Sequence, residues 1–222
     1  MTVRQRFRRL TLALVGTVLT FTPLACSHQE SKTTPAPRPV SQERSNPTAF
    51  SGSGTLTAPA PGSNAMTYNP ALAPADAAIL ASVTPHGYNY SRSVATLVVA
   101  GLLPNRSYAA QAHTNPCGAT GQDAGLLYQN RIDPAARPDA ASTDPRYTNS
   151  HNEIWLDVRT DASGEGTSQT TVPFGFTDRR PGSIVLSEAT ATGTGPGHAG
   201  EAGAPIACVT LQPDTGTSSG GR

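Results

Sequence analysis

Short apolar runs separated by turn residues recur along the chain between residues 66 and 213, and their hydrophobic positions partly alternate. No stretch shows a sustained 3.6-residue apolar period with capping residues at its ends, the pattern typical of a helix. Many short strands joined by Gly- and Pro-containing turns predict an antiparallel β-sandwich or β-barrel. The turn clusters lie at residues 85–87, 104–105, 161–164 and 180–182. The predicted strands cover residues 78–83, 93–99, 107–112, 153–158, 170–176, 183–186 and 206–211.

The first 26 residues have the pattern of a secretory signal. Four arginines precede an apolar run, residues 10–24, that contains no charge. This run is too short for a transmembrane helix. Cys26 directly follows Ala25, which resembles a bacterial lipobox, so we expect a lipid on Cys26 that holds the exported protein at the outer face of the cell membrane. The alternative is plain secretion, with Cys26 removed in the signal peptide or left as a free thiol.

Composition divides the rest of the chain into a linker, a folded domain and a tail. Residues 27–65 consist mostly of Ser, Thr, Pro, Ala and Gly, and such a stretch cannot bury enough apolar surface to offset its ordering entropy. We therefore expect a disordered tether over residues 27–65, a folded domain over residues 66–213 and a flexible tail over residues 214–222.

Charge and composition exclude several classes of protein. Charged residues are 14% and apolar residues 36% of the chain, which is too polar for a multi-span membrane protein and too weakly charged for a typical disordered charged tail. The net charge is +1, and removal of the four arginines of the signal would make the exported chain slightly negative. We therefore expect no nucleic-acid partner.

Cys117 and Cys208 are the only cysteines of the predicted domain. Cys117 lies in the first of two long irregular segments, residues 114–152 and 189–205, and Cys208 follows the second. An exported pair of cysteines is expected to be oxidised, and the absence of a Cys-x-x-Cys pair favours a structural disulfide over a redox site. Chain entropy assigns such a bridge about 4–5 kcal/mol. Loops of this length in a compact domain are either functional or disordered.

Residues 103–113, followed by Cys117 and Gly118, resemble the loop-and-strand signature of the Cu/Zn superoxide dismutases. Further similar pieces follow in the order of that family, and together they cover residues 66–212. The resemblance implies an eight-stranded Greek-key β-barrel with two long loops and a disulfide that joins a loop to a strand. The further pieces lie at residues 125–127, 161–164, 183–188 and 202–208.

In that family four histidines hold copper, and the resemblance implies that this chain retains one of them. Gln111 stands at the first histidine of a His-x-His strand, and the second is kept as His113. The histidine shared between copper and zinc is replaced by Leu127, and the last copper ligand by Ser187. The arginine that attracts superoxide is replaced by Pro205. The sequence therefore predicts a degenerate copper site with one imidazole.

The zinc ligands of the family come from the loop that corresponds here to residues 130–152. The resemblance places His151 near a zinc histidine and Ile154 at the zinc aspartate. For both His113 and His151 an ordinary role is also open, as a polar residue at a strand end and as a solvated loop residue.

The sequence favours an exported Cu/Zn superoxide dismutase-like domain that is not catalytic, holds no metal cofactor and serves as a structural or binding module for a protein partner that it does not identify. One alternative is an active superoxide dismutase that binds copper and zinc through ligands placed elsewhere. Another is a weak metal-binding protein that uses His113 and acidic groups of the loops. If the resemblance is correct, the four copper-ligand positions should meet at one place in the fold.

Overall fold

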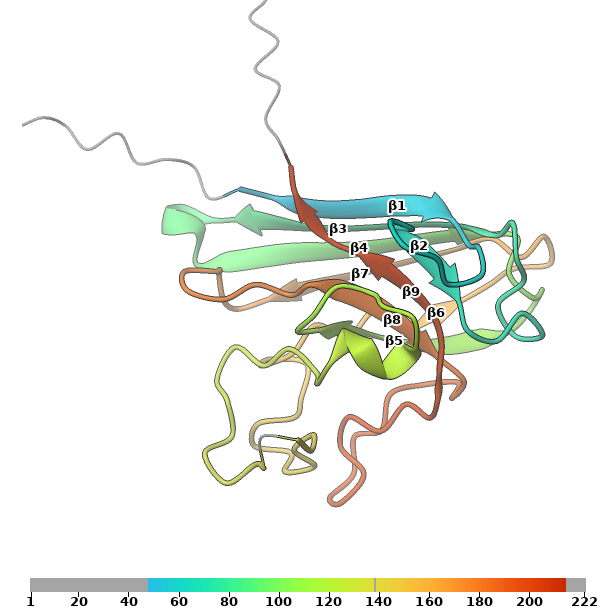
Figure 1. Ribbon diagram of the computed structural model, residues 1–222. Helices are drawn as coiled ribbons and strands as arrows, with labels where there is room; N and C mark the ends of the chain where they lie inside the picture. Colours follow the sequence, from blue (N-terminus) through green and yellow to red (C-terminus); the bar gives the residue numbers. More distant parts are fainter. Residues whose placement is uncertain (1–47, 138, 215–222) are drawn as a thin grey trace, which may run out of the picture. The chain divides into compact units, whose positions relative to one another are not determined.

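The computed structural model describes residues 48–137 and 139–214, which belong to one compact unit (Figure 1). This part of the chain forms ten strands in two five-stranded antiparallel sheets and two 3-10 helices, η1 (Tyr88–Tyr90) and η2 (Gly121–Ala124). No helix among these residues is long and apolar enough to span a membrane. The first sheet has the strand order β10 (Gln212–Pro213), β1 (Phe50–Thr55), β3 (Ala78–His86), β4 (Arg92–Ala100), β7 (Gly166–Val172). The second sheet has the order β2 (Ala65–Thr67), β9 (Pro205–Thr210), β8 (Ser183–Ser187), β5 (Ser107–His113), β6 (Val158–Arg159).

The strands of the first sheet alternate between buried and exposed side chains. On β3 the side chains of Ile79, Ala81 and Val83 are buried, whereas Leu80 is exposed and pairs across the ladder with the exposed Val98 of β4. A period of two places one face of a strand on the core and the other in water. This sheet therefore has one solvated face, as its sequence pattern predicts.

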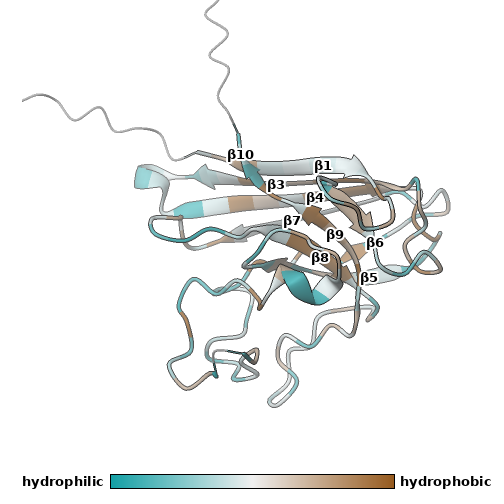
Figure 2. Cartoon of the chain, in the orientation of Figure 1, coloured by the Kyte–Doolittle hydropathy of each residue, from teal (hydrophilic) through white to brown (hydrophobic). Residues whose placement is uncertain are grey.

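The central strands of the second sheet are buried on both faces. Ile184 and Leu186 of β8 belong to the main core, whereas Val185 packs with Cys208 and Ala124 in a second, smaller cluster. Figure 2 accordingly shows strongly hydrophobic colours on β8 and β9. The outer face of this sheet is covered because the chain after β5 runs over it, and the disulfide between Cys117 and Cys208 ties that segment to β9.

The main hydrophobic core lies between the two sheets, because its buried residues come from strands of both. The predictions of an all-β fold and of one disulfide between Cys117 and Cys208 are therefore confirmed. The described chain has ten strands rather than eight, and the two sheets do not close into a barrel.

The predicted disordered tether is wrong for residues 48–65. Strand β1 lies in this segment and pairs with β3 and β10, and both Phe50 and Leu56 are buried in the core. The Gly- and Ser-rich composition that suggested disorder has a packing role, because a Cβ at Gly52 would overlap the carbonyl oxygen of Thr210. The folded region therefore begins before residue 66. The predicted signal, Cys26 and the tail after Asp214 lie outside the described residues.

Two predicted strands have different limits in the structure. The segment 153–158 runs beside β5, but the Asp157 carboxylate accepts the N–H of Ala110 at 3.1 Å, so regular pairing is confined to β6. Strand β7 covers Gly166–Val172 and ends before Pro173, rather than extending over residues 170–176. The Asp157 side chain thus limits the first strand, because it takes a main-chain partner of β5, and Pro173 limits the second.

Candidate functional site

All five positions of the predicted degenerate copper site line one cavity of about 400 Å³ on the outer face of the second sheet, which we call the His113 cavity. The register explains the convergence. Ser187 pairs with Ala109 of β5 and with Pro205 of β9, and an isolated bridge joins His113 to Leu127. Gln111 and His113 lie two and four residues after Ala109, and therefore on the same face of β5. The remaining lining residues are Gly125, Leu126, Ala141, Gly200, Glu201, Ala202 and Gly203.

His113 is held in one tautomer. Its Nδ1 lies 2.8 Å from the carbonyl oxygen of Gly125, and a carbonyl only accepts, so Nδ1 carries the proton and donates. Burial lowers the pKa of His113, against the opposing effect of this hydrogen bond, so the ring favours its neutral form. The neutral ring leaves a lone pair on Nε2. Gly125 has φ +74° and a Cβ there would meet Thr114 and Asn115, so this turn requires glycine.

The other polar groups of the His113 cavity are mostly acceptors. Gln111 is 2% exposed and donates from Nε2 to the carbonyl oxygen of Gly200 at 3.0 Å. Ser187 is 4% exposed, and its hydroxyl has no hydrogen-bond partner among the residues that the structure describes. Glu201 brings a carboxylate to the rim, where the Nδ1 of His198 lies 2.9 Å from it.

This donor set does not fit the copper centre that the resemblance implies. Copper in both oxidation states favours imidazole ligands, and the cavity offers one imidazole, an amide, a hydroxyl, the carboxylate of Glu201 at the rim and the alkyl side chain of Leu127. Within residues 48–137 and 139–214 no group of three or more His, Cys, Asp or Glu side chains could hold a metal ion. We therefore derive no redox step for this cavity.

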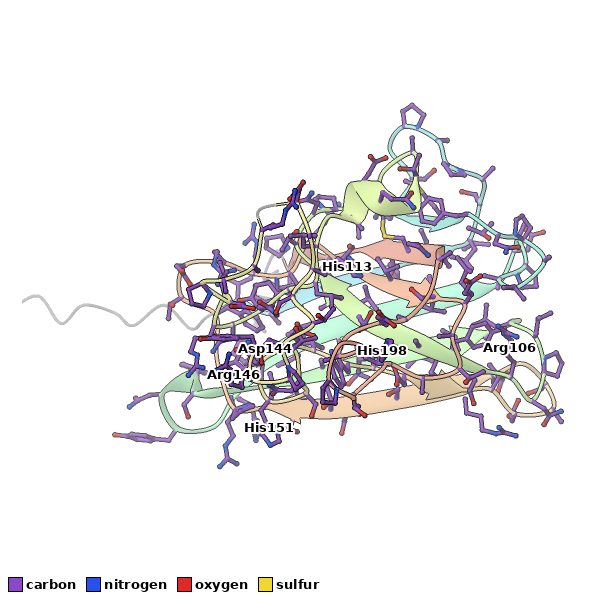
Figure 3. All side chains as sticks on the ribbon, turned by 90° about the horizontal axis from the view of Figure 1, so that it is seen from below. Arg106, His113, Asp144, Arg146, His151 and His198 are labelled. Atoms are coloured by element: carbon purple, nitrogen blue, oxygen red, sulfur yellow. A yellow bond between two sulfur atoms is a disulfide. The ribbon has the colours of Figure 1, made fainter. Side chains whose placement is uncertain are left out.

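The predicted zinc residues do not converge. His151 is exposed, whereas Ile154, at the position of the zinc aspartate, is completely buried in the main core. Figure 3 shows His113, His151 and His198 at separate places. The donors described here fit a zinc site no better than a copper site, and the interpretation of His151 as a solvated loop residue agrees with its exposure.

A buried carboxylate that the sequence analysis did not single out lies in the loop region near the predicted zinc site. Glu153 is 1% exposed and accepts hydrogen bonds from Gln129 Nε2 at 2.7 Å and from Trp155 Nε1 at 2.8 Å. Gln129 Nε2 also donates to Thr148 Oγ1 at 3.1 Å, and the Thr148 hydroxyl donates to the carbonyl oxygen of Ser142 at 2.7 Å. We call Glu153, Gln129, Thr148 and Trp155 the Glu153 cluster.

Burial raises the pKa of Glu153 from its ordinary 4.5 to about 7, although the hydrogen bonds from Gln129 and Trp155 act in the opposite direction. Both donors are neutral, and no cation is among the groups that shift this pKa. The one signal in the sequence is an acidic residue directly before the apolar run of residues 154–156.

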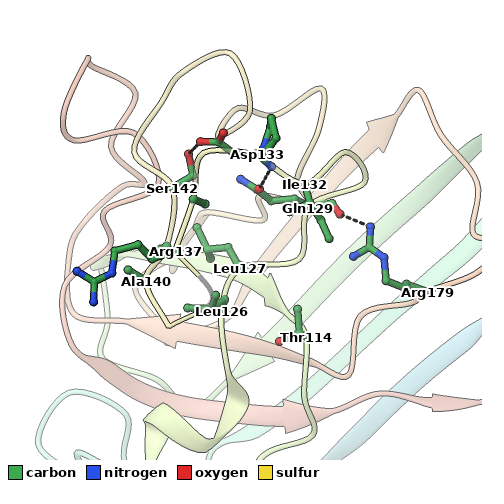
Figure 4. A pocket seen from close by; sticks show the side chains of 13 residues that line it. Thr114, Leu126, Leu127, Gln129, Ile132, Asp133, Arg137, Ala140, Ser142 and Arg179 are labelled. Carbon is green, nitrogen blue, oxygen red and sulfur yellow. Dashed lines mark hydrogen bonds between the residues drawn. The ribbon is translucent and has the colours of Figure 1, made fainter.

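A second cavity of about 420 Å³ lies next to the first and shares Leu126, Leu127 and Ala141 with it (Figure 4). Its walls are mainly apolar, and Arg179 lies at one side. The Arg179 Nη2 group donates to the carbonyl oxygens of Gln129 and Asn130, each at 3.1 Å, and is therefore engaged with the main chain.

Comparison with known proteins adds no family to this description. No model of a known protein family matches the chain, and no curated protein matches it.

Proposed function

We propose that this protein is an exported, non-catalytic domain of the Cu/Zn superoxide dismutase type that acts as a binding module through the His113 cavity. The observation that carries the proposal is that Gln111, His113, Leu127, Ser187 and Pro205, chosen from sequence resemblance alone, line a single cavity. Residues selected by an unrelated pattern would have no reason to meet at one place. The finer assignment, a Greek-key arrangement of the dismutase type, belongs to this proposal.

The disulfide supports the proposed export. Structural disulfides persist in oxidising compartments and are rare in the reducing cytosol of most organisms. Cys117 and Cys208 form such a bridge. With a lipid on Cys26 the domain would be held at the outer face of the cell membrane, and without it the protein would be secreted.

The chemistry of the cavity argues against dismutation. That reaction needs a metal that changes its oxidation state, and one imidazole does not make a four-histidine copper site. The charge of the cavity has also changed, because Pro205 carries no charge where the family has an arginine and Glu201 is negative. An anionic substrate such as superoxide is therefore not attracted by the lining.

Weak metal binding is a second candidate function. His113 leaves Nε2 unprotonated, and Glu201 lines the same cavity, so the two could act as partial ligands. Two such groups predict a metal that chelators remove easily.

The proposal is tested by rebuilding the missing ligands. The triple variant Gln111→His/Leu127→His/Ser187→His should bind one copper ion per chain and resist mild chelators, whereas the wild type should not. The matched control places three histidines at the exposed positions Thr55, Thr84 and Thr167, which lie on separate strands, and it should behave as the wild type. Copper is measured by metal analysis after dialysis, and folding by circular dichroism.

Two results would overturn the proposal. Chelator-resistant copper in the wild type, with superoxide removal well above that of free copper, would show that the protein is a working dismutase. A folded triple variant that binds no more copper than the control would show that the His113 cavity is not the former copper position.

A further inference from the structure

Three side chains that line the His113 cavity each carry a polar atom that has no partner among the described residues. No hydrogen bond reaches Gln111 Oε1, Ser187 Oγ or His113 Nε2 from the described residues. Gln111 and Ser187 are both more than nine-tenths buried. Among the described side chains, Arg106 Nε is the one buried nitrogen or oxygen that lacks both a partner and any accessible surface. The free atoms of Gln111, Ser187 and His113 therefore keep accessible surface, and the cavity is the space that these side chains line.

These free atoms are mainly hydrogen-bond acceptors. The side-chain nitrogen of Gln111 faces the Gly200 carbonyl, which leaves the amide oxygen free to accept. His113 carries its proton on Nδ1, so Nε2 accepts. The Ser187 hydroxyl both accepts and donates. These acceptors face one accessible space, so water, or a ligand that donates hydrogen bonds, can complete their hydrogen bonding.

The charge, the apolar walls and the volume of the cavity limit which ligands it can bind. Glu201 is the only charged residue in the lining, and it is negative. Leu126, Leu127 and Pro205 supply apolar walls. A volume of about 400 Å³ lies at the small end of ligand pockets. A positively charged donor with a short apolar body matches each of these properties.

We infer that the His113 cavity binds a small primary ammonium ion whose three N–H donors meet Gln111 Oε1, Ser187 Oγ and His113 Nε2 while its alkyl or aryl body lies against Leu126 and Leu127. Glu201 supplies the opposite charge at the rim. This inference rests on the proposed function and names the ligand class of the same cavity.

The test uses n-butylammonium as the probe, with 1-butanol and butyrate of similar size as comparisons. Titration is followed by calorimetry and by the NMR signals of the His113 ring. Butylammonium should bind saturably and shift the His113 signals. The neutral alcohol should bind about tenfold more weakly because it lacks the charge and two donors, and butyrate should not bind.

Two substitutions locate the site. Glu201→Gln should weaken butylammonium about tenfold and leave 1-butanol unchanged, and Ser187→Ala should weaken butylammonium severalfold. Glu165→Gln is the control, because it removes the same charge from an exposed turn outside the cavity, and it should bind as the wild type.

Equal affinity for butylammonium and 1-butanol, or the same loss of binding in Glu165→Gln as in Glu201→Gln, would overturn the inference. So would the absence of saturable butylammonium binding. In that case the proposed function still stands if the wild type takes no chelator-resistant copper. Tight copper with rapid superoxide removal would instead overturn the proposed function itself.

Discussion

The His113 cavity and the Glu153 cluster are two polar regions beside the same sheet, and they differ in how their hydrogen bonds are completed. In the cavity, Gln111, Ser187 and His113 each keep an atom without a protein partner. In the cluster, both carboxylate oxygens of Glu153 accept hydrogen bonds from neighbouring side chains. Buried polar groups are costly unless they are paired. The cluster is therefore complete without a ligand, whereas the cavity has an acceptor set that an external donor can complete.

The comparison separates two outcomes that sequence resemblance treats alike. Under the proposed resemblance, both regions would correspond to places where the Cu/Zn superoxide dismutases hold a metal. Near the predicted zinc site, this chain holds its loop with neutral hydrogen-bond donors around Glu153. Near the predicted copper site, it retains an imidazole and an accessible space. One region is thus closed by hydrogen bonds within the protein, whereas the other keeps an accessible cavity.

The largest expected effect comes from removing the disulfide. The double variant Cys117→Ala/Cys208→Ala should lower the free energy of unfolding by about 4 kcal/mol, because the bridge closes a long loop. Hydrogen exchange should rise most in residues 114–127, whose last three residues line the His113 cavity, and less in residues 148–155. Urea unfolding and hydrogen exchange measure the two effects. Equal loosening of both segments would contradict the distinction between the two regions.

The pH dependence of stability isolates the Glu153 cluster. The pKa of Glu153 is raised from 4.5 to about 7, so the folded protein binds this proton more tightly than the unfolded chain does. The contribution of Glu153 is complete below pH 4.5 and is lost as the pH rises through about 7, with a total of about 3 kcal/mol. The lowered pKa of His113 has the opposite effect on the free energy of unfolding, because the stability that His113 contributes is lost as the pH falls.

Urea unfolding of the wild type and of Glu153→Gln over this pH range therefore separates the two groups. The difference between their pH slopes reports Glu153 alone. Trp155 is the only tryptophan of the chain and donates directly to Glu153. Its fluorescence should change with a midpoint near pH 7 in the wild type and in His151→Gln, and should stay constant in Glu153→Gln. A change that persists in Glu153→Gln would assign the transition to another group.

Truncation of Glu153 should have a smaller effect at neutral pH. Glu153→Ala leaves the donors of Gln129 and Trp155 without their acceptor and should cost about 2 kcal/mol. Glu165→Ala, on an exposed turn, is the control and should change the free energy of unfolding by less than about 0.5 kcal/mol. Thermal and urea unfolding provide the measurement. Equal effects of the two substitutions would mean that the cluster contributes nothing to stability.

The smallest effect is expected in the cavity. Ser187→Ala removes a buried hydroxyl that has no protein partner, so the free energy of unfolding should change by less than about 0.5 kcal/mol or rise slightly. The comparison with Glu153→Ala is direct, since both residues are buried and polar. A loss of 2 kcal/mol in Ser187→Ala would show that its hydroxyl is satisfied in the folded protein.

The local sequence pattern was sufficient to predict those strands whose own residues form an apolar or alternating run. Strands β3, β4, β5, β8 and β9 coincide with apolar or alternating runs that turn residues delimit. The same pattern did not reveal β1, because small residues such as Gly52 and Ser53 carry little hydrophobic signal. At Gly52 a side chain is excluded because β1 packs closely on the main chain of Thr210, which is distant in the sequence.

The residues of the candidate site likewise include some that the sequence identified and one that it did not. Resemblance identified Gln111, His113, Leu127, Ser187 and Pro205 as one set, and strand register brings them to one cavity. Glu153 was missed because its character depends on burial and on donors from Gln129 and Trp155, one of them 24 positions away in the chain. No local property of the sequence marks a carboxylate as buried.

The sequence by itself determined the all-β class and the cysteine pair, because residue type and spacing are enough for those inferences. Only the tertiary structure decided which polar atoms are paired. Pairing depends on the register between β5, β8 and β9 and on the path of the covering loops, which bring together groups far apart in the chain. That difference in pairing is what distinguishes the His113 cavity from the Glu153 cluster.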